Sequence, residues 1–115
     1  MSLNLSEFKR FEKQIILKKI GISGQKKIKK SKVLIIGMGG LGCPLLAYLA
    51  SAGIHNIGII DHDKVELSNL NRQILFDTAD LGKYKAIQAK SKINKIYKKI
   101  QIKTFNQKVS TTNIK

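Results

Sequence analysis

The chain has 115 residues, of which 43% are hydrophobic, so it can build the core of one small domain but not of two. No apolar run reaches the roughly 18 residues of a membrane span. A lone cysteine excludes a disulfide framework and a four-cysteine zinc site. A cytoplasmic, reducing compartment is therefore expected. The net charge of +15 comes mostly from lysine, with arginine only at Arg10 and Arg72; nucleic-acid binding as the main role is therefore disfavoured, because dedicated readers of bases and phosphates favour arginine.

Residues 6–20 are expected to form an amphipathic helix with Ser6 as its N-cap. Four apolar side chains recur there at helical spacing: Phe8, Phe11, Ile15 and Ile16. Gly21 and Gly24 are expected to interrupt the helix, and a short basic helical turn follows as far as Ser31. The N-terminal part is therefore predicted to be a helical segment ahead of any sheet.

The apolar period changes at residues 33–36, whose compact, β-branched run predicts a strand buried on both faces. A glycine-rich turn at residues 37–42 comes directly after it, and residues 41–53 predict a helix that Gly53 ends as a C-terminal cap. The inward face of this helix is expected to consist of Leu41, Leu45, Leu49 and Ala52.

A second apolar strand is predicted at residues 57–60 and ends at Asp61. The polar connector that follows, residues 62–82, is long and has no clear period, and connectors of this kind are often functional. Residues 83–99 predict a lysine-coated helix, and residues 100–105 predict a third strand with alternating apolar positions. The helix is expected to bury Ala86, Ala89, Ile93 and Ile96. A further helix is expected to begin at Ser110 or Thr111.

The order of these elements predicts the α/β class: a Rossmann-type parallel sheet with helices on both faces. The chain supplies the first βαβαβ half of such a doubly wound fold, behind an N-terminal helix. We therefore expect residues 1–115 to form a single, truncated nucleotide-binding domain, with residues 1–31 as the helical segment and residues 32–115 as the βαβαβ half.

Residues 37–42 read G-x-G-x-x-G between a predicted strand and a predicted helix, and Asp61 ends the next strand. Gly37 allows the tight turn, Gly39 lets the backbone approach a phosphate, and Gly42 lets the helix pack closely on the strand. The N-terminus of the helix offers N–H groups to an anion, and Asp61 can accept hydrogen bonds from ribose hydroxyl groups. The pattern therefore predicts a nucleotide site.

The glycine turn does not itself distinguish ATP from NAD. A triphosphate carries several negative charges, and Arg72 and Lys85, in and just beyond the polar connector, can neutralise them. This placement favours ATP, with an NAD-dependent oxidoreductase as the other enzyme class.

Four stretches carry a more specific pattern: RFEKQIIL at 10–17, VLIIGMGGLGCP at 33–44, YLASAGIHNIGIIDHDKVELSNLNRQILF at 48–76 and LGKYKA at 81–86. From Arg10 to about Val109 the chain resembles the adenylyltransferases that activate ubiquitin-like sulfur carriers, the MoeB/ThiF/HesA group of the ubiquitin-activating superfamily. The resemblance implies that ATP and Mg²⁺ are used to adenylate the C-terminal glycine carboxylate of a small β-grasp carrier protein, with release of pyrophosphate.

The resemblance also implies roles for individual residues. Gly40 would lie against the phosphates, Asp61 would bind the ribose, and Asn69 would contact a phosphate or a metal-bound water. Arg72 and Lys85 would neutralise charge as pyrophosphate leaves. The implied nucleotide-binding set is Gly37, Gly39, Gly40, Gly42, Asp61, Asp63, Ser68, Asn69, Leu70, Asn71, Arg72 and Lys85, and the implied catalytic set is Arg72, Lys85 and Lys13.

Two departures from the family pattern qualify these roles. Lys13 stands where the family has a second arginine that reaches across a dimer to the neighbour's ATP, and lysine lacks the bidentate fork of arginine. The magnesium-binding aspartate, the paired CxxC zinc motifs and most of the carrier-binding surface belong to a second half with no counterpart here, so no metal ligand is predicted in this chain. Cys43 is expected to be a packing residue.

The expected partners are ATP, a carrier protein with a C-terminal Gly-Gly, and a second copy of the chain. A homodimer is expected because the first strand would leave an apolar sheet edge open without the second half. Two other readings stay open: a non-catalytic nucleotide-binding or partner-binding module, and a shortened gene product without a present function.

Overall fold

The computed structural model describes residues 2–110. In chain order its elements are α1 (Leu5–Arg10), α2 (Glu12–Ile15), α3 (Gly21–Lys30), β1 (Lys32–Ile36), α4 (Gly42–Ala52), β2 (Asn56–Ile60), the 3₁₀ helices η1 (Leu67–Asn69) and η2 (Thr78–Asp80), α5 (Lys85–Ile96) and β3 (Gln101–Phe105). The predicted α/β order is confirmed. The helix expected at Ser110 or Thr111 extends beyond the described residues.

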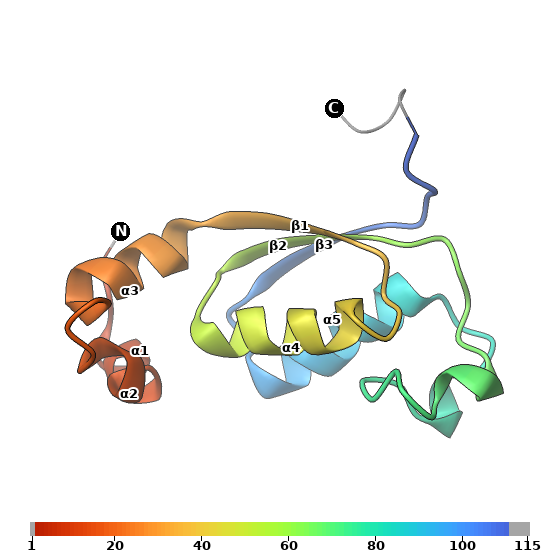
Figure 1. The fold of residues 1–115 in the computed structure, drawn as a ribbon, viewed down its shortest axis with the longest axis horizontal. Helices are drawn as coiled ribbons and strands as arrows, with labels where there is room; N and C mark the ends of the chain where they lie inside the picture. The colour runs from red at the N-terminus through yellow and green to blue at the C-terminus, as the bar shows by residue number, and fades with distance from the viewer. Residues whose placement is uncertain (1, 111–115) are drawn as a thin grey trace.

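The three strands form one parallel sheet in the order β1-β2-β3, with Val33 opposite Ile57 and Ile57 opposite Ile102. The crossover helices α4 and α5 lie side by side against the same face of this sheet (Figure 1). Both crossovers proceed in one direction across the sheet, and right-handed connections of that kind place their helices on one face. The Rossmann-type fold class is confirmed, while helices on the second face, expected of a complete doubly wound sheet, are absent from residues 2–110.

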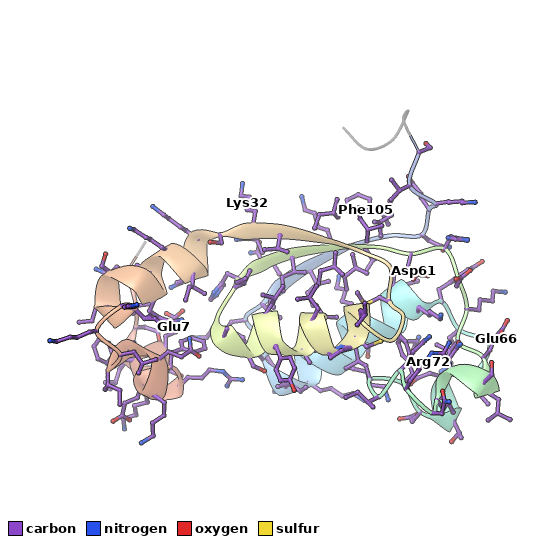
Figure 2. The ribbon with its side chains drawn as sticks, in the orientation of Figure 1. Glu7, Lys32, Asp61, Glu66, Arg72 and Phe105 are labelled. Carbon is purple, nitrogen blue, oxygen red and sulfur yellow. The ribbon has the colours of Figure 1, made fainter. Side chains whose placement is uncertain are left out.

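The expectation that β1 is buried on both faces is wrong for the described residues. Ile35 faces the helices and is buried, whereas Leu34 and Ile36 are 48% and 59% exposed on the open face. Lys32 and Phe105 stand on that same open side of the sheet (Figure 2). The side chains of β1 are therefore apolar on both faces of the sheet, but residues 2–110 provide helices that cover only one of these faces.

The predicted inward faces of the two crossover helices are only partly right. In α4 the buried side chains are Cys43, Leu46 and Ala50, and the expected Leu41 and Leu45 are exposed. This helix is apolar on almost every side, so two sets of positions have helical spacing and the pattern does not say which one faces the sheet. In α5 the burial of Ala86, Ala89 and Ile93 is confirmed, but Ile96 is exposed.

The N-terminal segment is not the single helix expected at residues 6–20. Its first helix is capped by Asn4 rather than Ser6, because Asn4 Oδ1 accepts the Glu7 N–H at 2.8 Å and Glu7 Oε1 accepts the Asn4 N–H at 3.0 Å. Helix α1 then ends at Phe11, which has non-helical backbone angles and a buried ring and separates α1 from α2. Gly21 has a positive φ of 58° and begins α3, so it starts a helix rather than interrupting one.

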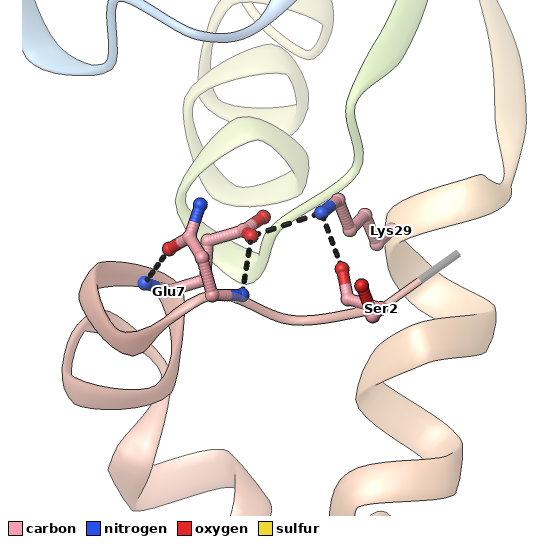
Figure 3. Close-up of polar contacts among 4 residues, drawn as sticks. Ser2, Glu7 and Lys29 are labelled. Atoms are coloured by element: carbon pink, nitrogen blue, oxygen red, sulfur yellow. Dashed lines mark hydrogen bonds and ion pairs between the residues drawn. The ribbon is translucent and has the colours of Figure 1, made fainter.

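Side chains of this helical segment attach it to the end of α4. Gln25 is fully buried; it accepts a hydrogen bond from Gln14 Nε2 at 2.9 Å and donates one to the Ala52 carbonyl at 3.0 Å. The Glu7 carboxylate pairs with Lys29 Nζ at 2.9 Å, and the same ammonium donates to the Ser2 carbonyl (Figure 3). These contacts fix the segment at the end of the sheet opposite the glycine turn (Figure 1).

We expect acid to destabilise the fold in two steps. Burial lowers the pKa of His55, with Glu7 opposing the shift, so the unfolded chain takes up a proton near its normal pKa of 6.5 before the folded protein does. Stability is thus lost as the pH falls below about 6.5, by at most ~1.4 kcal/mol per pH unit. Burial raises the pKa of Glu7, but hydrogen bonds from the Asn4 N–H and the Lys29 ammonium outweigh burial and hold this pKa below 4.5. A second loss of stability therefore begins as the pH falls below about 4.5, where the unfolded chain takes up a proton before the folded protein does.

Urea unfolding at a series of pH values tests this expectation. Replacing His55 with glutamine should flatten the dependence between neutral pH and pH 5 and leave the loss at lower pH in place. An unchanged slope in His55→Gln would contradict the assignment of the first step to this side chain.

Among residues 2–110, no helix has the length and apolar character needed to cross a membrane.

Candidate functional site

The glycine turn joins β1 to α4 with the backbone geometry that its sequence predicts. Gly37 has a φ of 91°, which favours glycine, and its N–H donates to the Ile60 carbonyl at 2.8 Å. A methyl group on Gly42 would lie 1.9 Å from the Gly37 carbonyl oxygen, so only glycine allows this close packing. Gly39 and Gly40, between them, have open space above their Cα atoms: a methyl group on Gly40 would meet nothing closer than the Arg72 side chain at 3.6 Å.

The N-terminus of α4 has no side-chain cap, because its N-cap residue is Leu41. The Cys43 N–H donates to the Gly39 carbonyl at 3.1 Å and Pro44 has no N–H, so the donors available to an anion belong to the glycine turn itself. The first N–H groups of a helix have no partner within the helix and carry part of the positive end of its dipole. The turn therefore offers backbone donors at a place where glycine permits close approach, which is the arrangement that binds phosphate.

Asp61 ties the glycine turn to the end of β2. Its carboxylate is nearly buried and accepts the Met38 N–H and the Asp63 N–H, both at 2.7 Å. A carboxylate has further lone pairs, so ribose hydroxyl groups can still donate to it. Asp61 also lines a hollow of about 320 Å³ at the carboxyl ends of β1 and β2 together with Gly37 and Asp63. Ligands of open α/β sheets bind outside the carboxyl ends of the strands.

The polar connector, which has no clear period in the sequence, is held in place by backbone pairing. Residues around Lys64 and Tyr84 form an antiparallel bridge, flanked by the Val65 N–H bonded to the Lys83 carbonyl at 2.8 Å. One step further, the Lys85 N–H donates to the Asp63 carbonyl at 3.0 Å. This pairing brings the start of α5 back to the end of β2, so Lys85 and Asp61 reach the same region although 24 positions separate them in sequence.

Lys85, at the start of α5, is a nearly buried lysine. It is 6% exposed, and no carboxylate lies within ion-pairing distance of its ammonium group among the described residues. Its positive charge opposes the rise in the pKa of the Cys43 thiol, so it acts on the start of helix α4. A lysine that is nearly buried and has no carboxylate partner in this part of the chain is suited to an anionic ligand.

Arg72 lies over the glycine turn on the side of the connector, and Figure 2 shows it on the same side of the molecule as Asp61. Its guanidinium donates to the Ser68 carbonyl and to Asn71 Oδ1, each at 3.1 Å. These two bonds leave other N–H groups of the five in the fork for a ligand. Arg72 thus lies against Gly40, while Lys85 acts on the start of α4 through its charge; their roles toward a nucleotide stay predictions.

The remaining predicted residues have more varied positions. Asn69 is nearly buried, and its Oδ1 caps the connector by accepting the Glu66 N–H at 2.9 Å; Leu70 packs against the core. Asp63 is exposed and lies 3.3 Å from His62 Nε2. Lys13 is exposed on α2, at the end of the molecule opposite the glycine turn, so a single chain does not bring it to this site (Figure 1).

Sequence reasoning missed Gln73. Its side chain is 2% exposed, and its Oε1 has no hydrogen-bond partner within residues 2–110. Its position directly after Arg72 in the N-R-Q run is the one signal that the sequence offered.

Cys43, a buried residue of α4, is a packing residue as expected, and its thiol donates to the Met38 carbonyl at 3.3 Å. Burial raises the pKa of this thiol to about 11, against the opposing effect of the Lys85 ammonium, so it is protonated at neutral pH. We expect a disulfide reagent to modify the native protein at least ~100-fold more slowly than the unfolded chain. Fast labelling of the native protein would contradict this burial.

A comparison with known protein families shows which family the chain belongs to. The profile described as the ThiF family matches residues 11–115. The chain belongs to the ThiF family. This ThiF-family chain is 46% identical over 114 residues to the adenylyltransferase and sulfurtransferase UBA4 of Vanderwaltozyma polyspora, a match that covers 98% of the chain and 26% of UBA4. It therefore spans about a quarter of the length of that relative.

Solved structures agree with the fold of this chain. The crystal structure of PaaA superposes with a TM-score of 0.85 at 37% identity, over 94% of the chain and 36% of PaaA. The Escherichia coli tRNA N6-threonylcarbamoyladenosine dehydratase, TcdA, crystallised in complex with ATP, superposes with a TM-score of 0.90 at 26% identity, over 98% of the chain and 46% of TcdA. TcdA thus holds ATP on a fold of this kind.

Proposed function

We propose that this chain is the ATP-binding part of an adenylyltransferase that activates the C-terminal glycine carboxylate of a ubiquitin-like carrier protein. The observation that carries the proposal is Lys85, a nearly buried lysine that has no carboxylate partner among residues 2–110 and whose charge acts on Cys43 at the start of α4. Arg72, over Gly40, adds a second cation at the glycine turn. Two cations and free backbone donors at one glycine turn match the charge of a triphosphate better than that of a dinucleotide.

The chemistry requires positioning more than acid–base catalysis. An oxygen of the carrier's carboxylate attacks the α-phosphorus of ATP, a new P–O bond forms, and the bond to the leaving pyrophosphate breaks. The carboxylate is already the nucleophile, so no strong base is needed. Lys85, Arg72 and the N–H groups of the glycine turn would hold the phosphates and offset the charge that develops on pyrophosphate.

Magnesium would enter with the nucleotide. Residues 2–110 contain no group of three or more His, Cys, Asp or Glu side chains that could hold a metal ion, and both Asp61 oxygens accept backbone N–H groups. The phosphates themselves would then be the main ligands of Mg²⁺ from this part of the protein, as is common for this ion.

A second copy of the chain would complete the site. Helix α2, which carries Lys13, lies at the end of the molecule opposite the glycine turn (Figure 1). A contact between the Lys13 ammonium and the phosphates therefore requires a second molecule. The uncovered sheet face, with Leu34, Ile36 and Phe105 exposed on it, supports association with further protein. We propose a homodimer in which Lys13 of one copy faces the nucleotide of the other.

Pyrophosphate exchange tests this function. The protein is mixed with Mg-ATP, labelled pyrophosphate and a carrier protein that ends in Gly-Gly, with a complementary C-terminal region of the family supplied as a second chain. Exchange that depends on the carrier and is lost in Arg72→Ala is the expected result. No exchange under these conditions would contradict the proposal.

A binding module without catalysis is the second candidate. The two candidates differ in one result: the module binds ATP but shows no exchange even when the complementary chain is added.

A further inference from the structure

Gln73 has a buried carboxamide that the fold leaves unsatisfied. Its backbone is fixed, because its N–H donates to the Asn69 carbonyl at 2.8 Å and its carbonyl accepts the Phe76 N–H at 3.1 Å. Its side chain is 2% exposed, and Oε1 has no hydrogen-bond partner among the described residues. Most buried polar side-chain atoms in proteins are bonded, and leaving one unbonded costs about 1–3 kcal/mol. An exception of this kind requires a functional or structural explanation.

The carboxamide of Gln73 points to the glycine turn. Its Nε2 lies 3.9 Å from the place where a methyl group on Gly39 would stand, in the open space above the turn. Gly40 faces Arg72 next to it, and Lys85 provides a buried positive charge in the same region. Two features therefore lie at this space, the Arg72 guanidinium and a helix N-terminus without a side-chain cap, and the charge of Lys85 acts on the same end of α4. All of them favour an anion.

A second buried glutamine shows how this chain treats a carboxamide with a structural role. Gln25 is also fully buried, but its oxygen accepts from Gln14 and its nitrogen donates to the Ala52 carbonyl. The two side chains have the same chemistry and the same burial and differ in their partners. A purely structural role explains Gln25 and does not explain Gln73.

We propose that Gln73 is a ligand-binding residue of the nucleotide site, whose carboxamide N–H donates to a phosphate oxygen held at the glycine turn. The carboxamide oxygen then accepts from a water molecule that the bound phosphate orders. Gln73 would add a neutral donor between the two cations, and it would fix the position of the phosphate without adding charge. This inference rests on the proposed function, because it takes the ligand to be a nucleotide.

Two matched substitutions test the proposal by calorimetric titration with Mg-ATP and by thermal unfolding. Gln73→Met keeps the length and packing of the side chain and removes its polar atoms. It should weaken ATP binding by roughly tenfold or more, as expected for a lost hydrogen bond to a charged group, and it should leave the melting temperature unchanged or raise it. Gln25→Met should do the reverse: a lower melting temperature and an unchanged affinity for ATP.

Equal ATP affinity in Gln73→Met and the wild type would overturn the role of Gln73 while leaving the proposed function in place. Absence of ATP binding in the wild type would overturn both. Gln73→Glu serves as a second variant of nearly the same shape: its carboxylate should repel phosphate and weaken binding further, and an affinity equal to that of the wild type would again overturn the proposal. Titration with inorganic pyrophosphate shows which phosphate is contacted, because a loss seen only with ATP assigns the contact to the α-phosphate.

Discussion

Replacing Lys85 with methionine is expected to weaken Mg-ATP binding by roughly ten- to hundredfold without lowering the melting temperature. Lys85 is nearly buried and its ammonium group has no carboxylate partner among the described residues, so the free protein loses little when the charge is removed. Methionine retains the aliphatic packing of the lysine stem. The bound phosphate, in contrast, loses a charge-assisted hydrogen bond, which is worth about 1.5–3 kcal/mol.

Lys95→Met is the matched control for this prediction. It removes the same charge from the same helix, but Lys95 is exposed in the last turn of α5. Its effect on ATP affinity should be smaller than about twofold at moderate salt, because exposed charges are screened. Calorimetry on both variants decides the matter. Equal losses in Lys85→Met and Lys95→Met would show that net charge, and not a placed ammonium, attracts the nucleotide.

Replacing Gly42 with alanine is expected to destabilise the fold by about 2–4 kcal/mol, because overpacking against rigid backbone is costly. The added methyl group would lie 1.9 Å from the Gly37 carbonyl oxygen and 3.0 Å from its carbonyl carbon. Both atoms belong to the turn itself, so relief of the clash requires α4 to move away from β1. Urea unfolding measures the loss.

Gly39→Ala separates the role of the fold from that of the ligand site. Nothing lies closer than 3.9 Å to the place of its methyl group, and Gly39 does not have a positive φ. Stability should therefore stay within about 0.5 kcal/mol of the wild type, while ATP affinity falls because the methyl group blocks the approach of a phosphate. An equal free energy of unfolding for Gly42→Ala and Gly39→Ala would contradict the close packing of α4 against the Gly37 carbonyl.

The strands and the glycine turn could be predicted because each carries a local signal. Residues 33–36 and 57–60 are short, β-branched runs, and the expected βαβαβ order follows directly from them. The direction that a helix faces is a tertiary property. In α4 the sequence does not distinguish the set with Leu41 and Leu45 from the set with Cys43 and Leu46, because all are apolar and only contact with the sheet decides. The break at Phe11 has the same origin, since burying its ring outweighs helix continuity.

The candidate site could be predicted as far as motifs identify single residues. Spacing and charge single out Gly37, Gly42, Arg72 and Lys85, and the structure places the two glycines and Arg72 at the start of α4. The connector's backbone pairing and the orphaned Gln73 could not be predicted, because both depend on contacts between residues far apart in the chain. A polar side chain becomes informative here only when its burial and its missing partner are known.

Calorimetric titration of Mg-ATP into the purified protein, with NADH as the comparison ligand, tests the central claim most directly. We predict saturable ATP binding that is lost in Arg72→Ala and no comparable binding of NADH. Binding of NADH in preference to ATP, or no binding of either nucleotide, would contradict the assignment of the glycine turn to ATP.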